Sequence, residues 1–413
     1  DHATRVGAEK TYLSRAFGMD WQVEIDYRTV DVQPGDIFLL STDGVHEFLP
    51  NPRLKSLLAQ ALDNPETCCE ALLDAAYMAG SDDNISCQIL VIDSIAPLEA
   101  EDSRLQASHL PLLPGLVAGQ IIDGLHIDAE LYASSRSQLY LVHDEITRRV
   151  MTLKMPSMHY ADDVEHLARF ALEDWVGQRI DHWNVVKGWP APRQRKCLYL
   201  LQEYLDGETL AAWAKKNPHP PVQIITGFAA QIIKGLRALH RRETLHQDLK
   251  PDNIFLCSDG TVKLIDLGSA SVAGFEDKLS NGRPGAAEYA APEYAFNLPR
   301  DSRADQFSLA ITLYELLTGQ HPFGEAYAVA QSPADFQLLH YTSACRHNPH
   351  VPVWLDAALK KACSFVADER YAALSEFLMD LESPNPTLAP VNARPWLERD
   401  PAGFWRSVAL LLM

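Results

Sequence analysis

The spacing of apolar residues over the first 95 positions predicts alternating strands and helices. The run at 36–41 is apolar and follows a Pro-Gly turn, so it predicts a buried strand. Residues 54–62 and 68–78 repeat apolar positions at helical spacing, and residues 85–92 return to a strand pattern. We therefore expect residues 1–95 to form a separate small domain that mixes both element types.

The stretch from 96 to 118 has no clear period and is interrupted by proline and glycine, so we interpret it as a linker. Strand patterns dominate from about 121 to 155, notably at 138–142 and 150–155. This region therefore predicts a sheet.

Helical patterns take over after Gly207. Residues 222–240 place apolar side chains at steps of three and four, which predicts an amphipathic helix. Residues 305–317 are apolar nearly all round, as is typical of a helix buried inside a large lobe. Strands followed by helices favour an α+β fold in two lobes.

Composition narrows the function more than the fold. The chain has 55 acidic and 36 basic residues, and the net charge of −19 argues against a nucleic-acid partner. Its seven cysteines are odd in number and form no CxxC pair, which argues against a disulfide framework or a zinc site and fits a reducing cytoplasm.

Both ends of the chain affect the expected location. The sequence opens on Asp1 without a targeting signal, so we expect a fragment of a longer protein. Residues 386–413 form a tail that ends in an apolar run at 408–413, far shorter than the roughly 20 residues of a membrane span. The tail is read either as an amphipathic end or as the start of a truncated membrane anchor on a cytoplasmic protein.

The segment 246–253, His-Gln-Asp-Leu-Lys-Pro-Asp-Asn, carries the strongest chemical signal. It resembles the catalytic loop of protein kinases, in which an Asp accepts the substrate hydroxyl proton and an Asn five residues later binds Mg²⁺. The resemblance assigns these roles to Asp248 and Asn253, and it implies that Lys250 contacts the transferred phosphate, as in the serine/threonine form. A lone His-x-Asp is usually a surface turn, but the complete string is specific.

Two further sites agree with this resemblance. Asp266, in Asp-Leu-Gly after an expected strand at 261–265, matches the second magnesium-binding position. Lys154 ends a strand-like segment, and Glu173 lies on an expected helix 19 residues later. In the kinase pattern this Lys and Glu form an ion pair that directs the ammonium group to the nucleotide phosphates.

The remaining motifs follow in the order that the family requires. After a strand at 198–201, Gln202 takes the gatekeeper position, while Glu203 and Leu205 supply the backbone groups that bind adenine. Further on come Ala-Pro-Glu with Glu293, its expected buried partner Arg370, and Asp305 at the start of the buried helix. Residues 119–385 are therefore identified as a member of the serine/threonine protein kinase family. The resemblance implies a bilobal fold and transfer of the ATP γ-phosphate to a protein hydroxyl, including one of its own.

The kinase pattern is incomplete at three points. Ser134 and Ser135 replace glycines of the phosphate-covering loop, so we expect a weaker hold on ATP. Gln247 replaces the arginine that binds a phosphorylated activation segment, which argues against switching by phosphorylation of Ser269, Ser271 or Ser280. Ala286 replaces a threonine whose hydroxyl would bridge the catalytic Asp and Lys.

The first 95 residues resemble the carboxy-terminal part of type 2C metal-dependent protein phosphatases, which have an α/β-sandwich fold. The resemblance rests on residues 13–18, Asp43 and Asp83, and it implies that the two aspartates bind Mn²⁺ or Mg²⁺. As plain sequence, Asp-Gly at 43–44 and Asp-Asn at 83–84 are turn formers. The family's other metal ligands belong to an earlier half, so we expect this partial domain to lack phosphatase activity.

Three functions are therefore weighed. The leading one is an active serine/threonine kinase. The second is a pseudokinase scaffold that binds nucleotide or partners without catalysis, favoured by Ser134, Ser135 and Ala286. The third is a bacterial parent protein, a fused phosphatase and kinase, that acts mainly as a phosphoprotein phosphatase.

Overall fold

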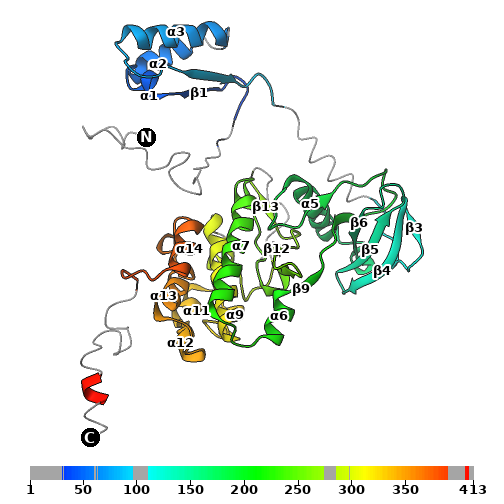
Figure 1. Ribbon diagram of the computed structural model, residues 1–413. Helices are drawn as coiled ribbons and strands as arrows, with labels where there is room; N and C mark the ends of the chain where they lie inside the picture. The colour runs from blue at the N-terminus through cyan, green and yellow to red at the C-terminus, as the bar shows by residue number, and fades with distance from the viewer. Residues whose placement is uncertain are drawn as a thin grey trace. The chain divides into compact units, whose positions relative to one another are not determined.

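The computed structural model describes residues 30, 32–59, 62, 64–95, 110–273, 285–296, 298–388 and 405–408. The chain divides into two compact units, residues 1–99 and 100–413, which are described separately (Figure 1). Residues 13–18, Ser280 and residues 409–413, which carry three of the sequence expectations, lie outside the described residues.

In the described part of the first unit, three helices pack with a two-stranded antiparallel sheet. Its elements are β1 (Ile37–Ser41), α1 (Asp43–His46), α2 (Asn51–Leu58), α3 (Pro65–Met78) and β2 (Cys87–Val91). The Asn64 side chain accepts a hydrogen bond from the Thr67 amide (3.1 Å), and Pro65 follows it, a favourable start for a helix. Val45, Leu72 and Ala76 are fully buried beneath the sheet residues.

The expected elements of this unit occur, with bounds that differ by one to four residues. The helix predicted for 54–62 spans Asn51–Leu58, because Pro52 suits a first helical turn even though it breaks the apolar pattern. The strands predicted at 36–41 and 85–92 and the helix predicted at 68–78 correspond to β1, β2 and α3.

The second unit begins with a six-stranded antiparallel sheet in the order β3-β4-β5-β6-β8-β7. The strands are β3 (Ile121–Ile122), β4 (Leu125–Ala133), β5 (Ser137–Asp144), β6 (Val150–Pro156), β7 (Gly188–Trp189) and β8 (Leu200–Glu203). Leu125, Tyr140, Val142 and Leu153 fill its core with no exposed surface. The two strand patterns read from the sequence, at 138–142 and 150–155, lie within β5 and β6.

The segment interpreted as a linker differs from the expectation at its described end. Residues 110–118 form no helix or strand, yet Leu113 and Leu116 pack against the core of the sheet. The Leu198 amide donates to Pro111 O (3.0 Å), and the Leu116 amide donates to Tyr140 Oη (2.9 Å). Single apolar side chains separated by prolines give no period, so the pattern did not reveal this packing.

Helix α5 (Val164–Arg179) lies beside the sheet, after a short 3-10 turn, η1 (Met158–Tyr160) (Figure 1). The Asp163 side chain caps its start by accepting from the His166 amide (2.9 Å). Its last turn meets β7 backbone to backbone: a Cβ atom on Gly188 would stand 2.6 Å from Gly177 C, so a glycine is required at 188. This close approach holds the last turn of α5 against the sheet.

The rest of the unit is mainly helical. Its longest helices are α7 (Val222–His240), as predicted, and α9 (Ser302–Thr318), most of whose residues are buried. The other helices are α6 (Leu210–Lys216), α8 (Pro292–Ala295), α10 (Ala326–Val329), α11 (Pro333–Leu338), α12 (Ala344–His347), α13 (Val353–Ala362), η3 (Ala367–Glu369) and α14 (Leu374–Glu382). Short strands are interspersed with these helices: β9 (Gly207–Thr209), β11 (Ile254–Cys257) and β12 (Val262–Leu264) form a three-stranded sheet, and β10 (Thr244–Leu245) pairs with β13 (Ser271–Val272). The turn η2 (Pro251–Asn253) precedes β11. The second unit is therefore a mixed α+β structure whose larger sheet lies mostly in its first part.

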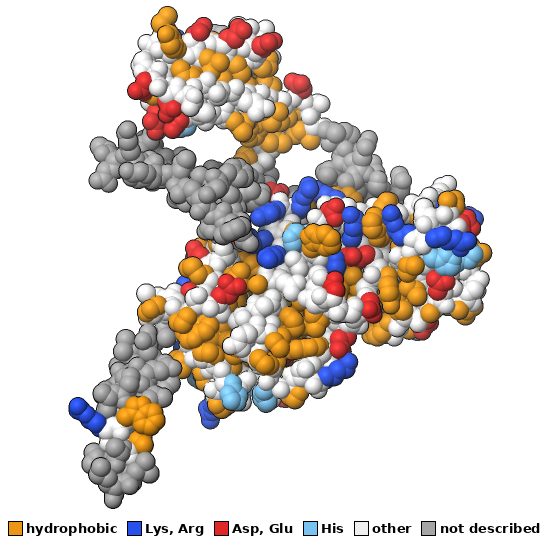
Figure 2. All heavy atoms as spheres, viewed as in Figure 1, with side chains coloured by type: hydrophobic (Ala, Val, Ile, Leu, Met, Phe, Trp, Pro, Cys, Tyr) orange, Lys and Arg blue, Asp and Glu red, His pale blue; other side chains and the backbone are white. Residues whose placement is uncertain are grey.

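The surface and the helices also bear on possible partners. On the face of the second unit seen in Figure 2, acidic, basic and apolar side chains are interspersed. Within the described ranges, no helix has both the length and the apolar character needed to cross a bilayer.

The predicted Glu293–Arg370 partnership is present as a buried, two-pronged ion pair. Arg370 Nη1 and Nη2 lie 2.7 and 2.8 Å from the two carboxylate oxygens of Glu293. The same guanidinium donates to Arg303 O and Ser364 O, both at 2.8 Å, which joins three segments of the helical lobe. Neither member of the pair has significant solvent exposure.

Replacing Arg370 by Met should lower the free energy of unfolding by about 3–5 kcal/mol, because Glu293 is left buried without a partner. Urea denaturation of the full chain, followed by tryptophan fluorescence, measures this loss. Asp368→Asn is the matched control, since Asp368 pairs with Arg303 (2.6 Å) at an 88% exposed site and should matter little. Similar losses for both variants would contradict the structural role of the buried pair.

Candidate active site

Three charged residues from three elements meet between the lobes. Lys154 Nζ, on β6, lies 2.7 and 2.8 Å from the carboxylate oxygens of Glu173 on α5. The same ammonium group lies 3.2 Å from Asp266 Oδ1, after β12. The ion pair expected from the sequence is therefore formed in the structure, with Asp266 as a third member.

Burial and charge compete at this triad. Burial lowers the pKa of Lys154, but the carboxylates of Asp266 and Glu173 outweigh it and raise that pKa overall, so the ammonium stays charged. Burial raises the pKa of Glu173 to about 7, against the opposing effect of Lys154. Lys154 lowers the pKa of Asp266 and keeps it anionic. The site thus holds one cation and a surplus of carboxylate, which suits a metal ion more than a bare phosphate.

The Asp248 carboxylate lies at the centre of a second group. Lys250 Nζ approaches both of its oxygens, at 3.2 and 2.9 Å, and Asn253 Nδ2 donates to Oδ2 at 2.8 Å. The Ala286 amide donates to Oδ1, also at 2.8 Å. The three catalytic-loop residues named from the sequence are thus adjacent. Ala286 adds a fourth contact from the activation segment, the stretch of chain that ends at the Ala-Pro-Glu motif with Glu293.

Asn253 and Asp266 lie on adjoining backbone segments, because the Ile265 amide donates to Asn253 O (2.9 Å). The Asn253 side-chain nitrogen is used by Asp248, so its carbonyl oxygen is the group left for a ligand. Asp266 bonds Lys154 and the Gly268 amide through Oδ1, which leaves Oδ2. An amide oxygen and a carboxylate oxygen are the donors that Mg²⁺ prefers, so the two residues fit that ion.

The expected adenine-binding residues lie at and after the end of β8. The strand spans Leu200–Glu203 rather than the expected 198–201, so Gln202 and Glu203 are its last two residues. The Glu203 side chain accepts from Lys263 Nζ and from the Lys187 amide, both at 2.8 Å, so it braces the strand rather than facing a ligand. Leu205 follows in the connection to β9.

The loop between β4 and β5, at the phosphate-covering position, forms hydrogen bonds within itself. Ser134 Oγ accepts from the Arg136 amide (3.2 Å) and the Ser137 amide (3.1 Å), and it donates to Ser137 O (3.1 Å). The Ser134 amide also donates to Ser137 O, at 2.9 Å. From the sequence we expect a weaker hold on ATP because serine replaces glycine here. In the structure the Ser134 hydroxyl also accepts hydrogen bonds from two of the loop amides.

In the first unit the start of α1, which carries Asp43, lies beside the segment that carries Asp83. Thr42 Oγ1 donates to Asn84 O (2.6 Å), and Ser81 Oγ donates to Gly44 O (2.8 Å). Each aspartate accepts from the amide of the next residue, as a turn-forming aspartate does. Over the described ranges, no group of three or more His, Cys, Asp and Glu side chains is placed to hold a metal ion.

Two contacts of the kinase site were missed by the sequence reading. Gln202 Nε2 lies 3.4 Å from Glu173 Oε1, which links the gatekeeper to the ion pair. Arg195 forms an ion pair with Asp174 (2.7 Å), which gives α5 a second charged contact next to Glu173. An Asp directly after the paired Glu is a weak signal for such an anchor, and nothing in the sequence indicates that Arg195 is its partner.

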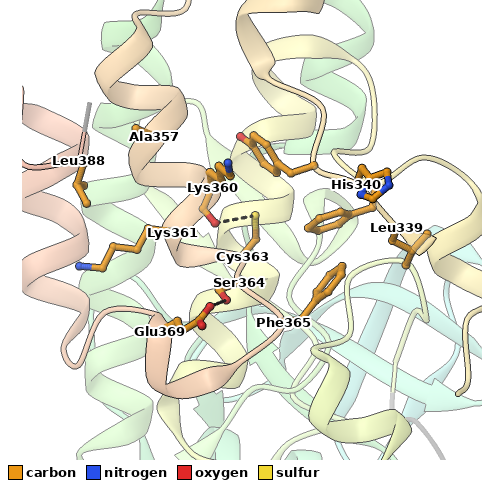
Figure 3. Close-up of a pocket in the computed structure, with 12 residues that line it drawn as sticks. Leu339, His340, Ala357, Lys360, Lys361, Cys363, Ser364, Phe365, Glu369 and Leu388 are labelled. Atoms are coloured by element: carbon orange, nitrogen blue, oxygen red, sulfur yellow. Dashed lines mark hydrogen bonds between the residues drawn. The ribbon is translucent and has the colours of Figure 1, made fainter. Parts of the chain in front are cut away.

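A hollow of about 480 Å³ lies elsewhere, in the helical lobe (Figure 3). Phe323, Tyr341 and Phe365 contribute aromatic walls, with Lys360 and Lys361 of α13 at its edge. None of the motif residues lines it, so it is separate from the chemistry described above.

Ser134→Gly should tighten Mg-ATP binding several-fold, to about tenfold, because it frees the Arg136 and Ser137 amides, each worth about 0.5–1.5 kcal/mol as a hydrogen bond. Equilibrium titration with a fluorescent ATP analogue measures the Kd. Ser135→Gly is the control: its side chain makes no hydrogen bond among the described residues, although it gives the loop the same flexibility. Equal affinities for both variants would show that the Ser134 hydroxyl is not what restricts the loop.

Comparisons with known proteins agree with this geometry. Residues 132–379, more than half of the chain, match the family described as protein kinase domain. A probable serine/threonine-protein kinase of Clostridium acetobutylicum is 28% identical over 262 residues, which are 62% of this chain and 39% of that protein. Serine/threonine-protein kinase PrkC of Bacillus subtilis is 29% identical over 249 residues, 60% of this chain and 38% of PrkC.

The crystal structure of the Mycobacterium tuberculosis PknI kinase domain superposes with a TM-score of 0.53 at 25% identity, covering 66% of this chain and all of that domain. The chain spans about two fifths of the length of the two curated relatives named above. From the family match and the assembled motif residues together, the chain belongs to the protein kinase domain family.

Proposed function

We propose that residues 119–385 act as a Mg-ATP-dependent serine/threonine protein kinase. The observation that carries the proposal is the position of Lys154, within 3.2 Å of both Glu173 and Asp266. The Asp248–Asn253 loop adjoins this triad through the Ile265 backbone. Phosphoryl transfer depends on positioning and charge neutralisation more than on covalent chemistry, and this arrangement supplies both.

Each residue then has a definite role. Asp248 accepts the proton of the substrate hydroxyl. The hydroxyl oxygen forms a bond to the γ-phosphorus while the bond between that phosphorus and the bridging oxygen breaks, and ADP leaves with this oxygen. Lys154 holds the α- and β-phosphates, Lys250 contacts the transferred group, and Asn253 and Asp266 hold the metal. Mg²⁺, when bound, neutralises charge on the phosphates. The backbone groups of Glu203 and Leu205 bind adenine, with Gln202 beside it at the gatekeeper position. The loop with Ser134 and Ser135 covers the phosphates loosely.

Control by activation-segment phosphorylation is not part of this proposal. Gln247 carries no charge to attract a phosphate on Ser269 or Ser271. Its backbone amide is held by Asp305 Oδ1 at 2.9 Å without any modification. The loop that carries Asp248 is therefore already supported.

A pseudokinase scaffold is the second candidate, because the Ser134 hydroxyl occupies amides that would otherwise bind phosphate. Such a protein would bind nucleotide or partners without transferring phosphate. Mg-dependent thermal stabilisation by ATP without turnover distinguishes it from the kinase.

For the first unit we propose a partial, inactive type 2C phosphatase-like domain that contributes Asp43 and Asp83. A complete Mn²⁺ or Mg²⁺ site, and with it a phosphatase acting against the kinase, would require further ligands in a longer parent protein. We also propose that the apolar tail continues into a membrane anchor in the longer parent protein. Determining the sequence before Asp1 tests both the missing half and this third function.

Phosphate transfer to candidate proteins and to the chain itself should need Lys154, Asp266 and a divalent metal. Lys154→Met should reduce incorporation from [γ-³²P]ATP by at least about a hundredfold, since it removes a preorganised phosphate ligand, and Asp266→Ala should do the same. Chelation with EDTA should abolish the signal. Equal incorporation by the wild type and both variants would rule out the kinase assignment.

A further inference from the structure

The backbone at Gly285 and Ala286 approaches Asp248 unusually closely. Gly285 has a left-handed backbone (φ +73°), and a Cβ atom at that position would stand 2.7 Å from Asp248 Cγ and closer still to Oδ1. Any residue other than glycine therefore collides with the proposed base. The contact places the Ala286 amide 2.8 Å from Asp248 Oδ1.

The donors around Asp248 differ in how freely they can leave. A carboxylate has about four lone-pair positions, and Lys250, Asn253 and Ala286 together make four contacts with this one. Asn253 Nδ2 is also bound to Asp248 O, at 2.8 Å, and the Ala286 donor is backbone. Only Lys250 is a flexible side chain, so a substrate hydroxyl gains access to Asp248 by taking the place of Lys250 while the amide contact remains.

We propose that the Ala286 amide, brought into place by Gly285, is the contact through which the activation segment orients Asp248. This amide contacts Asp248 in place of the threonine hydroxyl that the kinase pattern has at position 286. Gly285 is thus a positioning residue, and the inference rests on the proposed kinase activity. Because the donor is a peptide N–H, the orientation of Asp248 depends on backbone conformation rather than on a modifiable side chain.

Loss of the Ala286 contact should affect kcat and the KM for ATP differently. The amide acts on the base, whereas nucleotide is held by Lys154, Asn253 and Asp266. Loss of the amide contact should therefore lower kcat and leave the KM for ATP nearly unchanged. A merely structural role would lower kcat and raise the KM for ATP together, or would lower the amount of folded protein.

The test compares Gly285→Ala with Gly260→Ala in the full chain. Gly260 lies in the β11–β12 turn with φ +85° and open space around its missing Cβ, so its variant reports backbone strain without the collision. Gly285→Ala should lower kcat at least about tenfold, a part of the roughly 10²–10⁴ that a positioned base supplies, with the Kd for Mg-ATP within twofold of wild type. Gly260→Ala should keep kcat within twofold.

Ala286→Pro removes the donor N–H without adding a Cβ at 285, and it should reproduce the loss in kcat. This variant decides the matter if Gly285→Ala does not fold, as judged by stabilisation with Mg-ATP. A Gly285→Ala variant as active as Gly260→Ala, or an Ala286→Pro variant with wild-type kcat, overturns the inference alone. A wild-type chain that transfers no phosphate overturns the proposed function as well.

Discussion

The buried carboxylate of Asp305 is the constraint on which the site depends. It has no exposed surface, and it accepts hydrogen bonds from the His246 and Gln247 amides at 2.9 Å and lies 2.8 Å from His240 Nε2. Burial alone would raise the pKa of Asp305, but the His240 contact and the backbone donors outweigh it and lower that pKa. A charged group in the interior is tolerated here because each of its oxygens has a donor.

The loop before Asp248 is shaped by this carboxylate. Gln247 has a left-handed backbone (φ +65°), a conformation that costs energy for a residue with a side chain. Two amides pointing at one aspartate compensate for that cost. Helix α9, which carries Asp305, is buried along most of its length, so the loop is attached to the packed core of the lobe. The helical core thus positions Asp248, the proposed base, through Asp305 and the two amides that it binds.

The sequence was most informative where a residue's role is set by its local string. The bounds of α7, the ion pair of Lys154 with Glu173 and the partnership of Glu293 with Arg370 were all predicted, since periodicity and motif order determine them. What the sequence could not indicate are contacts between segments without a motif. The Ser134 hydroxyl bonds to the amides of its own loop, Arg195 anchors Asp174, and Gly285 approaches Asp248 because of backbone geometry. Residues 110–118 were missed for the same reason, as isolated leucines in a proline-rich stretch have no period.

The self-bonded loop between β4 and β5 also bears on the end of the catalytic cycle. In many enzymes release of the product, not the chemical step, limits turnover. A loop whose amides are occupied by Ser134 holds the phosphates of ADP no better than those of ATP. In the proposed kinase, ADP should therefore leave quickly, which would make the transfer itself the slower step. A kinase built in this way would respond to the cellular ATP level over a wide range, because weak binding keeps its nucleotide site far from saturation.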